Sequence, residues 1–305
     1  MVVKSVGKRV GEFVQYHING DGECNTVVLV EWANRHSLDL QERFELAYFF
    51  SITYAVESAI ILFEERENAL NHIKTWSQKN KRKIVFQSDR KYMRMKDSFE
   101  KCLKWFTGHR NVEDFLNRVQ VGEVIDLEIA INFIEGWTMF GRFSAFLFLE
   151  MFVNLIGAKI ENTTIDWKHG NTATSGLLNL FGYDKAADAF DKTGRLAVPA
   201  EKMDEHLETL IRMIEKAGGS ANVTEIETSL CAYRKFYKGS RYNGYYLDRM
   251  LEEVNAMNND YPSIIKEVLD IRRKKFDAKY LGEIGGWSGI RPSMKKVYRE
   301  TGLIT

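Results

Sequence analysis

Apolar residues recur three and four positions apart along most of the chain, and only three prolines interrupt the pattern. In the segment 40–63 this spacing places Phe44, Tyr48, Ile52 and Val56 on one stripe of a single helix. A repeat of this length is typical of an amphipathic or buried α-helix. The pattern therefore predicts a mainly α, multi-helix globular protein with little or no β-structure.

The same spacing predicts a series of further helices, at 92–105, 112–119, 126–140, 143–156, 175–180, 185–191, 201–217, 223–237, 242–255 and 263–275. Strand signals are sparse: the segment 84–86 could pair with 26–30, and both are short. Glycines follow several periodic runs, as expected at helix C-termini; they are Gly157, Gly194, Gly218, Gly219 and Gly239.

No repeat, low-complexity tract or clear linker divides the sequence. We therefore expect one helical domain over residues 1–305, with the polar turn at 218–222 as the best candidate for a sub-domain boundary. The segment 266–305 forms a basic C-terminal part.

Composition excludes several classes of protein. With 45% hydrophobic residues the chain can bury a large core, and its three cysteines have no pairing or metal-site spacing, which favours a reducing compartment. The most apolar region, 129–156, is interrupted by Glu135, Arg142 and Glu150, which disfavours a membrane-spanning helix. The N-terminal residues lack the apolar core of a signal peptide. We therefore expect neither export nor membrane insertion.

Positive charge is concentrated although the net charge is only +1. Residues 79–110 carry a local charge of +8, residues 31–69 carry −5, and residues 266–299 are basic again. Such segments favour a partner with repeated negative charge, and a phosphodiester backbone fits. The candidate DNA-binding residues share the first segment; they are Lys81, Arg82, Lys83, Arg90, Lys91 and Arg94. A solvated helix face is the alternative interpretation.

Glu150 lies in the run FSAFLFLEMFVNLIG, where its neighbours on every helical face are apolar. A carboxylate at such a position is paired, protonated through desolvation, or directed into a cleft. In a cleft it would suit proton abstraction near neutral pH. A buried acid held by a distant arginine or a helix N-terminus remains the structural alternative.

The stretch 161–176 is a polar loop that contains Asp166 and Lys168. Thr174 and Ser175, just before an apolar run, are predicted to cap a helix whose amides would then face the loop. Helix ends of this kind bind phosphate, with Lys168 as a cationic neighbour. Capping alone would also explain the two hydroxyl residues.

Residues 227–250 combine tyrosines with arginines and lysines around a Gly/Ser/Asn turn. We predict that Ile226, Leu230, Tyr233, Tyr237, Leu247, Met250, Leu251 and Val254 form apolar stripes, with Glu227 and Cys231 on another side of the first helix. Tyr245, Asp248 and Arg249 are expected to point away from the buried stripe of the second helix. The exposed rings and guanidinium groups would suit base stacking and phosphate pairing. Packing of tyrosines between two helices would explain the same residues.

Five motifs carry a resemblance to a known family. They are LQERFELAYFFSITY, FQSDRKYMRMKDSFE, MFGRFSAFLFLEMF, IDWKHGNTATSG and ETSLCAYRKFYKGSRYNGYYLDR, and over roughly residues 30–255 their order is that of the phage amino acid:DNA transferases. This group is also called the α-glutamyl/putrescinyl-thymine pyrophosphorylase superfamily. The resemblance implies a helical catalytic domain related to helix-hairpin-helix DNA glycosylases.

The resemblance also implies an activity. Such enzymes act on double-stranded phage DNA in which 5-hydroxymethyluracil has been pyrophosphorylated, and they replace pyrophosphate with the amine of a free amino acid or polyamine. We therefore expect a transferase in the cytoplasm of the infected bacterial host, with no membrane partner. No cofactor is certain, although Mg²⁺ could accompany pyrophosphate.

The roles of individual residues follow from the needs of this chemistry. The attacking amine must lose a proton, for which Glu150 or Asp166 is the candidate base. Leaving pyrophosphate needs positive charge or amides, for which the candidates are Arg142, Lys168, Thr174 and Ser175. The target base must be flipped out and held against rings.

Residues of the tyrosine-rich stretch supply the expected substrate-binding set. Tyr242, Tyr245 and Tyr246 would frame the flipped base, while Arg241 and Arg249 would bind phosphate or a substrate carboxylate, with Glu227 nearby. Cys231 could add to the pyrimidine ring, but a buried, inert thiol is the favoured interpretation. The competing functions are a base-excising enzyme of the glycosylase type and a non-catalytic DNA-binding phage protein.

Overall fold

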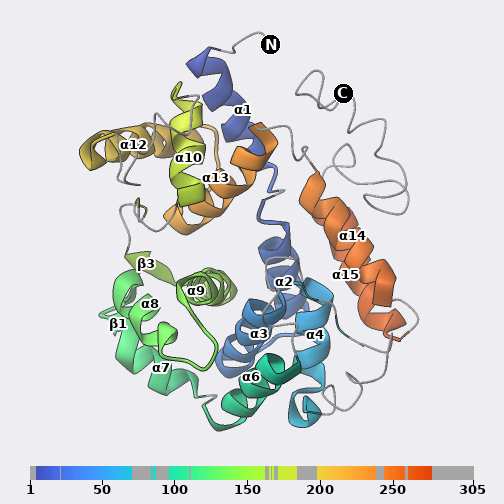
Figure 1. Ribbon diagram of the computed structural model, residues 1–305. Coiled ribbons are helices and arrows are strands. Elements are labelled where there is room, and N and C mark those ends of the chain that lie inside the picture. Colours follow the sequence, from blue (N-terminus) through green and yellow to red (C-terminus); the bar gives the residue numbers. More distant parts are fainter. Residues whose placement is uncertain are drawn as a thin grey trace. The chain divides into compact units, whose positions relative to one another are not determined.

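The protein was analysed as a computed structural model, shown in Figure 1. It describes residues 5–20, 22–70, 84, 86, 96–109, 111–161, 165, 167, 171–183, 198–237, 244–257 and 260–276. Helices dominate these residues, and only three short strands occur among them. The prediction of a mainly α protein is therefore confirmed.

The chain forms two compact units, each built from separate segments. Unit 1 contains residues 1–24, 162–249 and 276–305, and unit 2 contains residues 25–161 and 250–275. The turn at 218–222 lies inside unit 1 rather than at a boundary between the units.

Unit 2 holds most of the helices and all three strands. The helices are α2 (Cys24–Arg35, whose first residue belongs to unit 1), α3 (Leu40–Thr53), α4 (Val56–Glu64), the 3₁₀ helix η1 (Arg66–Asn68), α6 (Lys96–Gly108), α7 (Val112–Val119), α8 (Leu127–Glu135), α9 (Arg142–Ile156) and α15 (Pro262–Lys275). The segment 26–30, expected as a strand, lies inside α2, so that expectation was wrong. β-branched residues in a short apolar run fit either structure, and here the run continues to Arg35 as a helix.

Three short strands form a sheet beside these helices. β1 (Gln120–Val121) pairs antiparallel with β2 (Val124–Asp126), and β2 pairs parallel with β3 (Lys159–Glu161). The register places Ile125 opposite Ile160, and Asp126 ends β2 as the N-cap of α8 by accepting a hydrogen bond from the Ile129 amide.

The segment 40–63 forms two helices rather than the single helix that its periodicity predicts. Asp39 and Glu42 form a capping box at the start of α3. The helix ends at Tyr54, which adopts a left-handed conformation with φ of 56°, and α4 begins two residues later. The apolar stripe continues across the break, so a periodicity count alone could not detect it.

α3 and α9 form the centre of unit 2. A guanidinium nitrogen of Arg43, near the start of α3, donates to the carbonyl of Leu155, near the end of α9, so the two helices run antiparallel. Between them the Phe44 ring lies 5.3 Å from Phe148 and 5.5 Å from Phe115 on α7. Aromatic pairs at these distances contribute beyond their buried area.

Unit 1 packs α1 (Val6–Ile18), α10 (Asn171–Leu180), α12 (Ala200–Lys216) and α13 (Val223–Tyr237) around one apolar core. Helix α14 (Tyr245–Met257) begins in unit 1 and ends in unit 2. α10 and α13 approach closely at Gly176, where an added Cβ would meet the Leu230 carbonyl oxygen at 2.4 Å. Glycine is required there because the two backbones occupy the space that a side chain would need.

His17 joins α1 to α13 inside unit 1. Its Nε2 donates to the Ser220 carbonyl at 2.8 Å, and its Nδ1 lies 2.9 Å from the Ser229 hydroxyl. Because a carbonyl only accepts, Nε2 carries the proton, and the neutral ring accepts from Ser229. Both side chains are buried, so this Ser–His pair is a structural contact rather than an exposed nucleophile and base.

Protonation of His17 is expected to make stability depend on pH. Burial is the largest effect on the ring and lowers the pKa of His17 below its ordinary value of 6.5, against the opposing effects of Ser220 and Glu225. The unfolded chain therefore binds a proton more readily than the folded chain, and the free energy of unfolding should fall as the pH drops below 6.5. Chemical denaturation across this range measures the effect.

The control for this prediction is another histidine. In the variant His17→Gln the decline of stability below pH 6.5 should become shallower, whereas His109→Gln, which changes an exposed ring, should keep the wild-type slope. Equal slopes in all three proteins would contradict a buried neutral His17.

Candidate functional site

Glu150 lies on α9 and is buried, with 4% of its surface exposed. Its neighbours Leu149 and Met151 are fully buried as well. The Glu150 carbonyl accepts a hydrogen bond from the Asn154 side chain, one turn later. A carboxylate in such surroundings is costly to keep charged unless it is paired, which makes it a candidate for proton transfer.

Arg142 is the first residue of α9. It forms an ion pair of 2.9 Å with Glu128 on α8, and the Glu128 side chain is 61% exposed. The N-cap of the helix, Gly141, has no side chain, and the first turn contains no acid. The start of α9 therefore combines a cation with the positive end of the helix dipole.

An aromatic pair that the sequence analysis did not single out lies where α3 ends and α9 begins. The rings of Tyr54 and Phe143 are perpendicular, with centroids 6.3 Å apart. Phe143 is 50% exposed although it belongs to a helix that is otherwise largely buried. In the sequence, only the position of Phe143, seven residues before Glu150, could have drawn attention to this ring.

The motif IDWKHGNTATSG is attached to the core of unit 1 by two side chains. Ile165 and Trp167 are buried, and the Trp167 indole donates to Asp204 on α12 at 2.9 Å. Asp166 and Lys168, the candidate base and cation of this motif, lie outside the described residues.

The predicted helix N-terminus at Thr174 and Ser175 is wrong. α10 begins at Asn171, so both residues lie inside the helix and are buried. The Thr174 hydroxyl donates to the Trp167 carbonyl at 3.2 Å. The helix begins earlier because Ala173 belongs to the buried stripe that continues with Leu177, and no free amides face the loop from 174–175.

The tyrosine-rich stretch divides between core and partly exposed positions. The predicted apolar stripes are confirmed at seven positions, which are all buried: Ile226, Leu230, Tyr233, Leu247, Met250, Leu251 and Val254. The side chain of Tyr237 lies outside the described residues. Asp248, expected to point away from the buried stripe, is fully buried, so that expectation was wrong. Consecutive residues such as Leu247 and Asp248 point about 100° apart around a helix. Both are buried because α14 is covered on more than one side.

The candidate substrate-binding residues of this stretch lie at the edge of unit 1. Glu227, Cys231 and Arg249 are half-buried, and Cys231 packs against the core. Tyr245 and Tyr246 are also half-buried, with perpendicular rings 5.2 Å apart, and Tyr246 contacts the core. Arg241 and Tyr242 lie outside the described residues.

The candidate DNA-binding residues of the basic segment all lie outside the described residues; they are Lys81, Arg82, Lys83, Arg90, Lys91 and Arg94. Two apolar positions between them are described. Ile84 and Phe86 are buried, and the Phe86 ring lies 5.2 Å from Phe99 on α6. These contacts attach the basic segment to the core of unit 2.

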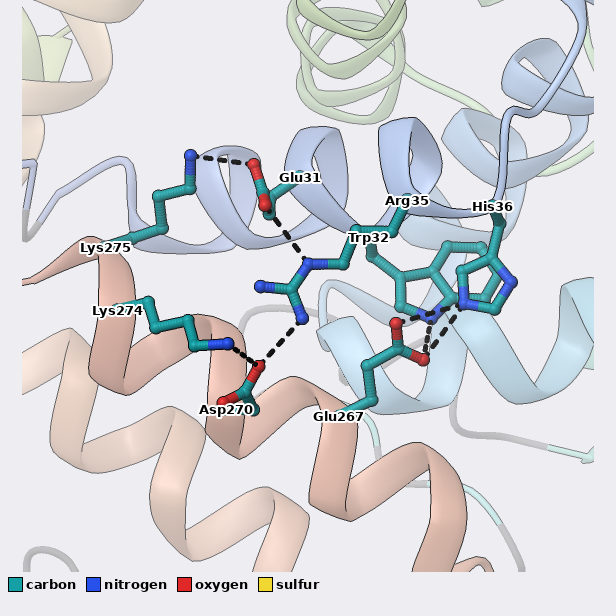
Figure 2. Close-up of polar contacts among 8 residues, drawn as sticks. All are labelled: Glu31, Trp32, Arg35, His36, Glu267, Asp270, Lys274 and Lys275. Carbon is teal, nitrogen blue, oxygen red and sulfur yellow. Dashed lines mark hydrogen bonds and ion pairs between the residues drawn. The ribbon is translucent and has the colours of Figure 1, made fainter.

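The basic end of α15 is largely engaged with acids, as Figure 2 shows. Lys275 binds Glu31 at 2.7 Å, and Lys274 binds Asp270 at 3.0 Å. Arg35 on α2 joins both acids, at 3.1 Å and 2.9 Å. The network connects α15 to α2, so Lys274 and Lys275 contribute less free positive charge than the sequence indicates.

A second polar group connects the same two helices. Glu267 on α15 accepts from the Trp32 indole at 3.2 Å and pairs with His36 at 3.0 Å, and the His36 ring stacks on Trp32 (Figure 2). Together these contacts give the α2–α15 surface a structural role.

Within the described part of the chain, no group of three or more His, Cys, Asp or Glu residues lies together as a metal site would require. No helix in these ranges is long and apolar enough to cross a membrane.

Comparison with known proteins identifies the family. No curated protein matches the chain. The family described as amino acid:DNA transferase matches residues 36–242. This range includes the α3–α4 segment, α9 with Glu150, the Trp167 motif, and α13. Since the match covers about two thirds of the 305 residues, the chain belongs to the amino acid:DNA transferase family.

Proposed function

We propose that the protein transfers an amino acid or polyamine to the 5-methylene group of pyrophosphorylated 5-hydroxymethyluracil in phage DNA and releases pyrophosphate. The family match supports the transfer of an amino acid to DNA, because the family's description names a DNA acceptor and an amino acid donor. The modified base and the release of pyrophosphate are what the resemblance of the five motifs implies. The site of action would be the cytoplasm of the infected bacterial host.

The proposed reaction is a displacement at the methylene carbon. The lone pair of the amine nitrogen forms a C–N bond, and the bond from the methylene carbon to the pyrophosphate oxygen breaks with its electron pair on the leaving group. The proton lost by the amine passes to a carboxylate, either Glu150 or Asp166. Burial of Glu150 supports this role, since proton transfer is most effective where water is excluded.

The leaving pyrophosphate gains negative charge as the bond breaks, and cations near it lower the barrier. Arg142 suits this role because it is the first residue of α9, where the positive end of the helix dipole adds to its charge. Lys168 is the second candidate. The described residues contain no carboxylate cluster for Mg²⁺, and no step of the proposed reaction is assigned to a metal.

Substrate recognition is proposed for the half-buried residues at the edge of unit 1. Tyr245 and Tyr246, with Tyr242, would contact the flipped base, and Arg249 and Arg241 would bind phosphate or the carboxylate of the amino acid. With a polyamine donor, Glu227 would bind the ammonium group that does not react. Cys231 packs against the core, which favours an inert thiol over addition to the ring.

The test uses DNA that carries pyrophosphorylated 5-hydroxymethyluracil, incubated with the protein and each member of an amine panel. Mass spectrometry of the digested nucleosides should find one new nucleoside and an equal amount of free pyrophosphate. DNA with unmodified 5-hydroxymethyluracil is the control and should not react.

Two other results would change the functional assignment. Alkali-labile abasic sites would indicate a base-excising enzyme. DNA binding with no mass change for any amine would indicate a non-catalytic protein and refute the transferase proposal.

A further inference from the structure

We propose that Phe143 and Tyr54 form a stacking surface for a pyrimidine base of the DNA substrate, beside the start of α9. This inference rests on the proposed function, and its residues are not among the proposed tyrosines of α14. All of its residues belong to unit 2.

Exposure of the Phe143 ring is the first observation. Most of α9 is buried, but Phe143 keeps half of its surface accessible after its contact with Tyr54. The perpendicular contact supports the ring on one side, and Tyr54 is itself held by Phe50, 5.4 Å away. A supported, half-exposed aromatic ring is the feature on which proteins stack unpaired bases.

The backbone beside the pair is the second observation. Tyr54 adopts a φ of 56° and Met139 a φ of 68°, and both conformations are unusual for residues other than glycine. Glycine would end α3 at position 54 without steric cost, as it ends α9 at Gly157. A tyrosine in this conformation therefore indicates that the ring is retained for its contacts. Met139, four residues before Phe143, adds a second exposed apolar side chain.

Charge at the start of α9 favours a nucleotide over a neutral ligand. The first residue of the helix is Arg142, next to Phe143, and the first turn has no acid. The Glu128 side chain in the ion pair with Arg142 is 61% exposed, so a phosphate group from solution can reach this cation. A ring for the base and a cation for phosphate lie at adjacent positions.

The position of Glu150 connects this surface with the proposed chemistry. Phe143 and Glu150 are seven residues apart, which places them on the same side of α9 and about 10 Å apart along its axis. Phe146 lies between them on this side and is half-buried, so exposure decreases from Phe143 to Glu150. A DNA base stacked on Phe143 would therefore lie on the side of α9 that contains Glu150, next to Arg142.

The test measures binding and turnover separately. Replacement of Phe143 by Ala should weaken binding of a single-stranded oligothymidylate by about 5- to 150-fold, the usual loss for one stacked base. The same variant should raise KM for modified DNA. Phe143→Trp should keep binding close to wild type, and the fluorescence of the added indole should be quenched by the oligonucleotide.

Two controls separate stacking from simple apolar contact. Phe143→Leu keeps an apolar side chain without an aromatic face and should behave like Phe143→Ala. Ile129 is an exposed apolar residue on α8. Ile129→Ala should bind the oligonucleotide as the wild type does, and the oligonucleotide should not quench the indole added by Ile129→Trp. Wild-type binding in Phe143→Leu, or an unquenched indole in Phe143→Trp, would refute the stacking surface.

Failure of this inference can be told from failure of the proposed function. If the wild-type protein forms the new nucleoside and Phe143→Ala does so with unchanged KM, the stacking surface is refuted and the transferase stands. If no nucleoside forms but the indole of Phe143→Trp is quenched, the surface stands and the proposed reaction is refuted.

Discussion

Replacement of Glu150 by glutamine is expected to lower the rate of nucleoside formation by about 10²- to 10⁴-fold, the usual contribution of a general base. Glutamine has nearly the same shape but cannot accept the proton of the attacking amine. Glu150 is 4% exposed, and glutamine fills the same volume at this buried position, so the fold should persist. Single-turnover assays with the modified DNA measure the rate, and thermal unfolding monitors the fold.

The control is Glu135→Gln, which makes the same chemical change at an exposed position near the end of α8 and should leave the rate unaltered. Asp166→Asn distinguishes the two candidate bases. Full activity in Glu150→Gln together with loss in Asp166→Asn would assign the proton transfer to Asp166 and leave Glu150 as a structural residue.

Replacement of Gly176 by alanine is expected to lower the free energy of unfolding by about 1–3 kcal/mol, as overpacking of a core usually does. The new Cβ would lie 2.4 Å from the Leu230 carbonyl oxygen and 3.0 Å from its carbon. These are backbone atoms within α13, so no side chain can rotate away and the two helices must separate. Chemical denaturation measures the change.

Gly11→Ala is the matched control because Gly11 also lies within a helix of unit 1, and an added Cβ would meet nothing within 4 Å. Alanine in a helix interior is more stabilising than glycine by about 0.5–1 kcal/mol, so the free energy of unfolding of this variant should be slightly higher than that of the wild type. A stable Gly176→Ala would show that α10 and α13 are farther apart than described.

The helices that could be predicted best are those whose ends are marked locally. The ranges expected for α7 (112–119) and α13 (223–237) agree with the structure at both ends, and α9 begins one residue before its expected start. Asn111 caps α7 by accepting from the Glu113 and Asp114 amides, and Gly157 ends α9 in the left-handed conformation. Such signals lie within a few residues of the helix end and can be read from the sequence.

Features that depend on distant residues could not be predicted. Residues 26–30 form a helix because α2 packs within unit 2, whereas their composition also suits a strand. Positive charge counted at Lys274 and Lys275 is neutralised by Asp270, on the same helix, and by Glu31, which is far away in the sequence. The apolar run around it indicated Glu150, and the family resemblance included the Trp167 motif, but neither indicated the exposure of Phe143.

Periodicity, caps and motifs thus established the helical class, several helix boundaries, the family and a buried carboxyl group on α9. Packing alone determined the break at Tyr54, the position of Thr174 within α10, the burial of Asp248 and the half-exposed ring of Phe143. The physical reason is that backbone hydrogen bonds and caps act within a few residues, whereas burial and ion pairing depend on the residues that other segments bring into contact.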